Sequence, residues 1–343
     1  MNELATTGFL YVEIAEKLEN QILEGVLQVG DKLPSLRVLQ QEYGVSISTI
    51  LQAYYFLEAK SLIESRPRSG YYVVFCGDKI PENPVKSSPD KLPVLGSSSD
   101  LIIDFFHKLD NDVGINFSRG VPSPELLPIA KLNKVMHEAI MKLPQGGTAQ
   151  GGILGRISLR RQIARRSVLW GGNLKEDDLV ITSGCTSALS LSLMAVTKPG
   201  DTIAVESPVY FGLLQLADTL GLRVHELPTD SVTGLDIDAL KIALENTEIK
   251  AVAIVSNFSN PLGNTMPDAN KKELVKVIQD HEIPLIEDDI YGDIYYGKQR
   301  PNTCKTYDDS GLVILCGSFS KTLASGYRIG WVAAGKFQEE VLR

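Results

Sequence analysis

The chain has 343 residues, of which 43% are hydrophobic and 22% charged, as is typical of a globular protein with a large core. Its net charge of −8 at pH 7 excludes a uniformly basic nucleic-acid binder, so any contact with DNA must be local. No apolar run is long enough to cross a membrane, the N-terminus lacks a signal-peptide pattern, and the four cysteines lack metal-binding spacing. We therefore expect a cytoplasmic protein with neither a disulfide framework nor a bound metal.

The first 75 residues predict three short helices followed by a two-stranded hairpin. Apolar residues recur at helical spacing over residues 9–24, and a second helix is predicted over residues 36–43. A third helix is predicted from the N-cap residue Ser46 through Leu57. Residues 62–74 alternate and are interrupted by a basic turn, which predicts two strands joined by a basic tip. This order is that of a helix-turn-helix with a wing.

Residues 77–113 are rich in proline and serine and lack periodicity, so we expect a linker, with residues 100–109 forming either a short helix or the end of that linker. Beyond it, an irregular segment leads to a predicted helix over residues 129–142. Strands are then predicted over residues 179–182, 202–206, 223–227, 250–256, 283–287 and 312–316, with helices over residues 186–196, 209–220, 236–245 and 267–281 between them. This alternation predicts a mostly parallel sheet between helices, whose ligands bind at the carboxyl ends of the strands.

The strongest chemical signal lies in residues 312–331. A buried strand ends near Ser318, and Lys321 follows at its mouth. This amine, with the hydroxyls of Ser318 and Ser320 and the guanidinium of Arg328, suits a ligand that carries both a carbonyl and an anionic group. Pyridoxal phosphate has both groups. The alternative is a surface lysine after a strand, because short motifs of this kind often arise by chance.

This stretch resembles the lysine signature of the fold-type I aminotransferases at Ser318, Ser320, Lys321, Gly326, Arg328, Gly330 and Trp331. The resemblance implies that pyridoxal 5′-phosphate is the cofactor and that Lys321 is the catalytic residue that bonds to it. Upstream segments resemble other parts of the same site. A cup at a helix N-terminus, where backbone N–H groups suit a phosphate, is formed by Ser183, Gly184, Cys185 and Thr186.

The resemblance assigns the cofactor ring to four further side chains. Tyr210 would stack on the ring, and Asn260 and Tyr291 would reach its phenolic oxygen. Asp288 would pair with the ring nitrogen, with Asp289 as the other candidate for that role. Each also has a structural alternative, namely a core tyrosine, an Asn-Pro turn or a solvated acidic loop.

The N-terminal segment resembles the winged helix-turn-helix of the GntR regulators at Gly30, Leu33, Pro34, Ser35, Arg37, Val45, Ser46, Thr49, Ala53, Leu57 and Gly70. In that family the third helix enters the major groove and the wing touches the DNA backbone. The resemblance implies DNA contacts at Arg37, Ser48, Thr49, Gln52, Arg66 and Arg68. Residues 1–75 carry six basic and nine acidic side chains, so we expect weak or narrowly specific binding. An interaction domain that does not meet DNA is the alternative.

Together the two resemblances imply an α/β chain of the kind found in the MocR regulators. Residues 8–76 would form the winged helix-turn-helix, residues 77–113 the linker, and residues 114–343 the fold-type I large domain with a truncated C-terminal small domain. The implied function is a homodimeric regulator that binds double-stranded DNA and senses an amino acid, an amine or a B6 vitamer. An active aminotransferase and a DNA-binding scaffold with an empty cofactor site are the alternatives.

Two features of the aminotransferases are missing from the sequence. Their carboxylate-binding arginine lies well past the lysine, whereas this chain ends at Arg343, so we expect either a fragment or a degenerate site unless Arg119 substitutes. The segment of residues 145–155 also lacks the tyrosine that in the family reaches the neighbouring subunit's phosphate.

Overall fold

The computed structural model describes residues 10–74, 86–89, 94–95, 120, 122–143, 148 and 151–343. The chain divides into two compact units, Met1–Asn83 and Pro84–Arg343, which are described separately below. None of the helices in the described ranges is long and apolar enough to span a bilayer. The possible short helix at residues 100–109 and the possible substitute Arg119 both lie outside the described residues.

The N-terminal unit contains three helices and a two-stranded wing, as the sequence predicts. Its elements are α1 (Leu10–Leu23), α2 (Leu36–Tyr43), α3 (Ile47–Ala59), β1 (Ile63–Arg66) and β2 (Gly70–Val73). The two strands pair antiparallel, so that the basic turn forms the tip of the wing. One apolar cluster that includes Ile14, Leu39, Ile50 and Leu57 joins the three helices and the wing. This unit therefore has a core of its own.

Local capping sets the geometry of the helix-turn-helix. The Ser35 hydroxyl accepts from Val38 N at the start of α2, and the Ser46 hydroxyl accepts from Thr49 N at the start of α3. Between the two helices, Gly44 has φ of 65°, a left-handed conformation that glycine adopts without steric strain. The turn therefore follows from residues that the sequence pattern had already marked.

The larger unit is built on a mostly parallel sheet. Its strands are β3 (Val94–Leu95), β4 (Leu179–Thr182), β5 (Thr202–Ser207), β6 (Arg223–Asp230), β7 (Gly234–Leu235), β8 (Ile249–Ile254), β9 (Leu285–Asp288), β10 (Val313–Ser318) and β11 (Gly330–Ala333). The strand order is β3-β6-β5-β8-β9-β10-β11-β4, and β7 pairs with β6 outside this path. Strands β6, β5, β8, β9 and β10 are parallel to one another, whereas β11 runs antiparallel to both β10 and β4. Consequently β4 points the same way as β10.

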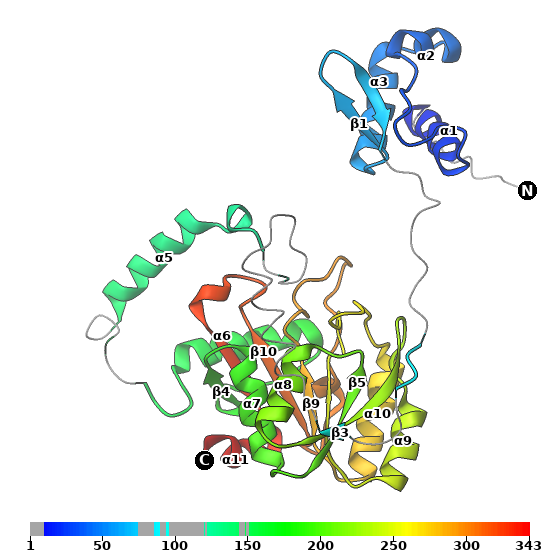
Figure 1. Ribbon diagram of the computed structural model, residues 1–343. Helices are drawn as coiled ribbons and strands as arrows, with labels where there is room; N and C mark the ends of the chain where they lie inside the picture. The colour runs from blue at the N-terminus through cyan, green and yellow to red at the C-terminus, as the bar shows by residue number, and fades with distance from the viewer. Residues whose placement is uncertain are drawn as a thin grey trace, which may run out of the picture. The chain divides into compact units, whose positions relative to one another are not determined.

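Helices cover both faces of this sheet (Figure 1). The helices are α6 (Ile157–Arg166), α7 (Cys185–Val196), α8 (Phe211–Thr219), α9 (Ile237–Asn246), α10 (Asp268–Asp280) and α11 (Gln338–Leu342). One apolar cluster packs α7, α8 and α11 on one face, and a second packs α9 and α10 on the other. Burial on both faces explains why the central strands are continuous apolar runs.

Two described parts of the expected linker, residues 86–89 and 94–95, contact the sheet of the larger unit. Strand β3 pairs antiparallel with the edge strand β6, and the Ser87 hydroxyl accepts from Thr229 N at 3.0 Å and donates to Ser207 O. An unpaired sheet edge exposes N–H and C=O groups that another segment can satisfy. The short strands β3, β7 and β11 were not predicted, and β3 and β7 have only two residues each, too few to show a periodicity.

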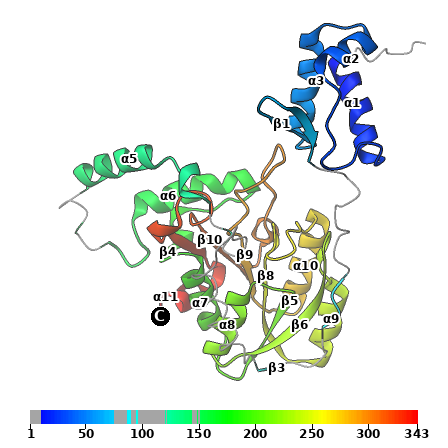
Figure 2. The same ribbon diagram turned by 45° about the horizontal axis from the view of Figure 1, so that its top comes forward.

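Helix α5 (Ile129–Lys142) begins and ends at the predicted residues, yet it contains no buried residue. Both ribbon views show it standing clear of the sheet (Figures 1 and 2). Its amphipathic pattern therefore predicts the helix correctly, although the apolar side chains Val135 and Ile140 are exposed.

Glu206 is an unusual group in the sheet, because its carboxyl is buried near the end of β5 with one hydrogen-bond partner among the described residues. One carboxyl oxygen accepts from Val255 N at 2.7 Å, whereas Oε1 has no hydrogen-bond partner among the described residues. Burial raises the pKa of Glu206 from 4.5 to about 8. The folded larger unit therefore holds a proton here at neutral pH that an unfolded chain would release.

We expect Glu206→Gln to flatten the pH dependence of stability. The contribution of a protonated Glu206 is fully present below pH 4.5 and is lost as pH rises toward 8. Relative to the variant, the wild-type free energy of unfolding should fall by up to ~1.4 kcal/mol per pH unit in this window. Urea unfolding followed by tryptophan fluorescence measures the free energy of unfolding of the larger unit at each pH. Both tryptophans, Trp170 and Trp331, lie in that unit. Parallel pH profiles for the two proteins would show that Glu206 is ionised in the fold.

Candidate functional site

Five strands of the larger unit end at one edge of the sheet, and the predicted site residues follow those ends. Ser183 follows β4, Tyr210 follows β5, Asn260 follows β8, Asp288 ends β9 and Lys321 follows β10. Because these strands point the same way, residues up to 138 positions apart are collected at one place.

Lys321 lies at the centre of this edge in a half-buried position. Its Nζ donates to Gly120 O at 3.0 Å and lies 5.8 Å from the centre of the Tyr291 ring. Burial lowers the pKa of Lys321, and the nearby carboxylate of Asp288 opposes that shift. Desolvation thus brings the amine closer to its neutral, nucleophilic form. Gly120 was not among the predicted site residues, and the available signal was a glycine in an otherwise irregular segment.

Asp288 is buried and is held by two hydrogen bonds to the same oxygen. Cys185 Sγ donates to Asp288 Oδ1 at 3.1 Å, and Ile290 N donates to Oδ1 at 3.0 Å. Burial raises the pKa of Asp288 to about 6, while these two bonds and Lys321 oppose the rise. At pH 7 and above the carboxylate is therefore ionised, so it can hold a cationic partner.

The predicted phosphate cup is packed against Arg328. Gly184 is the N-cap of α7, has φ of 100°, and makes no side-chain cap, so the N-cap residue does not satisfy the first N–H groups of the helix. Arg328 Nη2 donates to Ser183 O at 3.1 Å, and a Cβ on Gly184 would lie 2.3 Å from the same nitrogen. Only glycine therefore allows this approach. Thr186 is exposed in the first turn of α7.

Two hydroxyls complete the cup beside the guanidinium. Ser318 Oγ donates to Ser320 Oγ at 2.8 Å and is also 3.0 Å from Ile329 O, while Arg328 Nη1 lies 3.4 Å from Ser320 Oγ. Helix dipole, hydroxyls and guanidinium converge here, which is the donor set that an anion requires.

The remaining predicted ring contacts also lie at this edge. Burial raises the pKa of Tyr210 and of Tyr291, and the charge of Asp288 adds to both shifts, so both phenols lie near that carboxylate. A hydrogen bond from Asn260 to the Tyr291 side chain opposes the shift of Tyr291. Tyr210 is half-buried and is the N-cap residue of α8.

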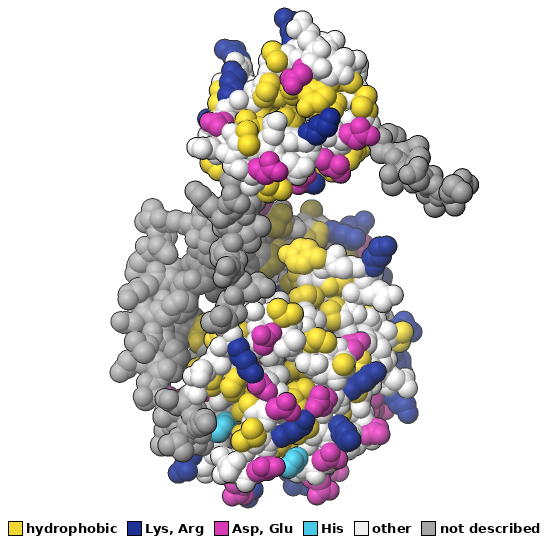
Figure 3. Space-filling view, turned by 90° about the vertical axis from the view of Figure 1, so that its right-hand side faces the viewer, with side chains coloured by type: hydrophobic (Ala, Val, Ile, Leu, Met, Phe, Trp, Pro, Cys, Tyr) yellow, Lys and Arg dark blue, Asp and Glu magenta, His cyan; other side chains and the backbone are white. Residues whose placement is uncertain are grey.

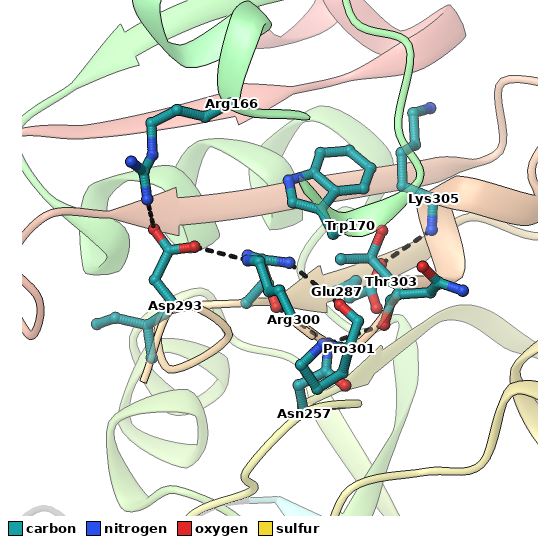
Figure 4. A network of polar contacts seen from close by, with 12 residues as sticks. Arg166, Trp170, Asn257, Glu287, Asp293, Arg300, Pro301, Thr303 and Lys305 are labelled. Carbon is teal, nitrogen blue, oxygen red and sulfur yellow. Dashed lines mark hydrogen bonds and ion pairs between the residues drawn. The ribbon is translucent and has the colours of Figure 1, made fainter. Parts of the chain in front are cut away.

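Asp289, the other candidate for pairing with the ring nitrogen, belongs to a different network of contacts from Asp288. Arg300 pairs with Asp289, and Asn257 Nδ2 donates to Asp289 Oδ1 at 3.2 Å. Two further ion pairs extend this network, as Figure 4 shows. Asp293 pairs with Arg300 Nε at 2.6 Å and with Arg166 Nη2 at 2.7 Å. The charge of Asp289 is thereby compensated within the protein.

The predicted DNA contacts lie on the surface of the N-terminal unit. Arg37, Ser48, Gln52, Arg66 and Arg68 are exposed and Thr49 is half-exposed. Ser48 and Thr49 hydroxyls lie 2.7 Å and 2.8 Å from the hydroxyl of Ser46, which orders the start of α3. Arg66 is partly engaged, because its Nε pairs with Glu64 at 2.7 Å.

Lys32 is a further cation at the wing that the sequence patterns missed. Its Nζ lies 5.9 Å from the centre of the Tyr72 ring, and Arg66 Cζ lies 4.3 Å from the same ring centre. A bridge between the backbones of Lys32 and Tyr72 brings the two together across 40 positions. The ring also bonds through its hydroxyl to Ser69 at 2.6 Å, which fixes it at the tip of the wing.

Comparisons with known proteins match two different families to the two units of the chain. Residues 114–342 match the family described as aminotransferase class I and II, and residues 10–73 match the bacterial regulatory proteins of the gntR family. The chain is 40% identical over 332 residues to the uncharacterized HTH-type transcriptional regulator YjiR of Escherichia coli K12, covering 97% of this chain and 70% of that protein. It is 30% identical to the HTH-type transcriptional regulator NorG of Staphylococcus aureus USA300, covering 89% of this chain and 68% of that protein.

Aminotransferases are among the solved structures that are similar to this chain. An archaeal alanine:glyoxylate aminotransferase superposes with a TM-score of 0.65 at 27% identity, over 75% of this chain and 63% of that one. The kynurenine aminotransferase of Pyrococcus horikoshii, solved with PMP, has a TM-score of 0.64 at 27% identity, over 71% of this chain and 61% of that one. This chain thus spans less than two thirds of the length of these enzymes.

We expect Asp289→Asn to destabilise the larger unit by roughly 3 kcal/mol, because it leaves the buried Arg300 with one partner fewer. The matched control is Asp288→Asn, since Asp288 is equally buried but forms no ion pair among the described residues. Asp288→Asn should lower the free energy of unfolding by much less than Asp289→Asn does. Urea unfolding followed by tryptophan fluorescence compares the two, and equal losses would contradict the distinction.

Proposed function

Because the chain belongs to the aminotransferase class I and II family and also carries a gntR-family domain, we propose that it is a transcriptional regulator of the MocR type. In this proposal the N-terminal unit binds double-stranded DNA, and the larger unit binds pyridoxal phosphate and senses an amino acid, an amine or a B6 vitamer. One observation carries this proposal. The same chain contains a winged helix with its own core and a sheet edge at which Lys321 could bond to a cofactor. The regulator names of YjiR and NorG support it. We further propose a cytoplasmic homodimer.

The residues at the carboxyl edge fit pyridoxal phosphate. The close approach of Arg328 to Gly184, with Ser318 and Ser320 beside it, leaves a set of donors suited to the phosphate. When bound, the cofactor supplies an aldehyde that reacts with amines and a ring that withdraws electrons. Lys321 is the amine that would hold it.

The other side chains would orient the ring and hold its protons. Asp288, ionised above pH 6, would keep a proton on the ring nitrogen, because a buried carboxylate favours a cationic neighbour. Tyr210 would cover one face of the ring, and Asn260 with Tyr291 would donate to its phenolic oxygen. Displacement of Lys321 by an incoming amine would free its ammonium to move, which gives an effector a way to favour one arrangement of the chain over another.

A working aminotransferase is the second candidate, and a specific observation favours it. The amine of Lys321 has a lowered pKa while Asp288 stays ionised, and both are needed for proton transfer during turnover. The wing favours the regulator, because such an enzyme has no need of a DNA-binding unit. Release of a 2-oxo acid separates the two functions.

We expect borohydride to label Lys321 after incubation with pyridoxal phosphate. A half-buried amine with a lowered pKa should react with the aldehyde, and peptide mass spectrometry should place the reduced pyridoxyl group on Lys321. Lys321→Ala should abolish both the label and the visible absorbance, whereas Lys336→Ala, at an exposed lysine, should change neither. Amino acids that alter the absorbance without release of 2-oxo acid would support the sensor, and sustained release would support the enzyme. A wild-type protein that stays colourless would refute cofactor binding.

We expect Lys32→Ala to weaken DNA binding in a salt-dependent way. The chain first selects its operator from a pool of random duplexes, and its affinity is then measured over a range of salt concentrations. Loss of one phosphate contact should reduce the slope of log K against log salt by about 0.9. The matched control is Lys17→Ala, because Lys17 also lies over a tyrosine ring, at 5.4 Å, but on α1. Equal slopes for the Lys32 variant and the wild type would remove Lys32 from the interface.

A further inference from the structure

Cys185 has a role in this edge that its assignment to the phosphate cup does not explain. It is the first residue of α7, is 4% exposed, and directs its thiol away from the cup toward the end of β9. Its sulfur lies 3.1 Å from Asp288 Oδ1, across 103 positions of sequence. The backbone of Cys185 thus belongs to the cup while its side chain contacts Asp288.

The hydrogen bonds of Asp288 are unevenly shared between its two oxygens. Cys185 Sγ and Ile290 N both donate to Oδ1, and Oδ2 accepts no hydrogen bond from the described residues. The orientation of the carboxyl group is therefore set from one side only. Without the thiol, a single backbone N–H would remain to hold it.

The thiol can act only as a donor in this position. Burial and the charge of Asp288 raise the pKa of Cys185 well above its ordinary value, so the sulfur keeps its proton. A thiol is a weak donor, but a bond to an ionised acceptor in a buried site is stronger than the same bond in water. The other titratable groups that act on Asp288 or are acted on by it are Glu206, Tyr210, Glu287, Tyr291, Cys316 and Lys321.

We propose that Cys185 is a positioning residue that orients Asp288 and favours its ionised form, so that Oδ2 faces the ring nitrogen of the cofactor. This inference deepens the proposed function and rests on it. Ser183, Gly184 and Cys185 are consecutive, so Cys185 belongs to the loop that would hold the phosphate. Its side chain also contacts Asp288, which would hold the ring nitrogen. A shift of the loop would therefore move the carboxylate as well.

The first test uses the full chain without cofactor, so it does not depend on pyridoxal phosphate binding. Asp288 is titrated by carbon-13 NMR of protein labelled at its aspartate carboxyls, with Asp288→Asn to identify the signal. Loss of a donor to the ionised form should raise the pKa of Asp288 by about half to one unit in Cys185→Ala. Cys185→Ser, which restores a donor, should return it close to the wild-type value. An unchanged pKa in the alanine variant would overturn the proposal.

The second test measures the affinity for pyridoxal phosphate as a function of pH. A higher pKa of Asp288 leaves less of its carboxylate ionised, so Cys185→Ala should bind roughly two- to fivefold more weakly at pH 6 and less than about twofold more weakly at pH 7. The difference should narrow above pH 8, where Asp288 is ionised in every variant. A loss that is the same at all pH values, or one that Cys185→Ser does not repair, would indicate a packing defect and refute the positioning role.

The matched control is Cys316→Ala. Cys316 is also a buried cysteine, but its sulfur lies 3.3 Å from the hydroxyl of Ser192 rather than against the carboxylate. Cys316→Ala should leave the titration of Asp288 and the pH profile of pyridoxal phosphate binding close to those of the wild type. If the wild-type chain itself takes up no pyridoxal phosphate, the proposed function fails, whereas the titration of the cofactor-free variants still decides the role of Cys185.

Discussion

Three consecutive buried carboxylates at the end of β9 are the constraint on which this edge of the sheet depends. Removing ionised groups from water is costly unless partners compensate them, and each of the three is compensated differently. Glu287 accepts from the backbone of Cys304 and Lys305 and from the Ser256 hydroxyl. Asp289 pairs with Arg300. Asp288 is held by a thiol and one N–H group, without a cation at ion-pair distance among the described residues. Asp288 is consequently the carboxylate that a cationic ligand group can complete.

The same edge shows how close approach of the backbone gathers the donors of the proposed phosphate site. Gly184 and Gly330 bring β4 and β11 together so closely that a Cβ on Gly330 would lie 2.5 Å from the Gly184 backbone. This contact lets Arg328, which follows the turn before β11, reach the carbonyl of Ser183. The donors that we propose for the phosphate thus depend on an antiparallel strand inserted beside β10. The rigid sheet, rather than any single loop, sets the distances between the groups.

The N-terminal unit meets a different physical requirement, since it must attract DNA within an acidic chain. Acidic and basic side chains are interspersed over the face of the larger unit that Figure 3 shows, so that face offers no basic patch. In the N-terminal unit, two of its few cations, Lys32 and Arg66, lie against the single ring of Tyr72. Gathering them at the wing raises the local positive potential without making the chain basic overall.

The sequence by itself determined the long elements and the order of the two units, and it supplied the candidate site residues. Apolar periodicity is a local property, so it identified α3, α5 and the strands that end at Asp288 and Ser318. Resemblance in motif order likewise indicated Lys321 and the phosphate cup. Only the tertiary structure distinguishes the surroundings of Asp288 and Asp289, because these depend on Cys185 and Arg300, which lie 103 and 11 positions away respectively. Gly120, Lys32 and the short strands β3 and β11 also owe their positions to contacts between distant segments, and no local pattern encodes which distant partner will satisfy a buried charge or an open strand edge.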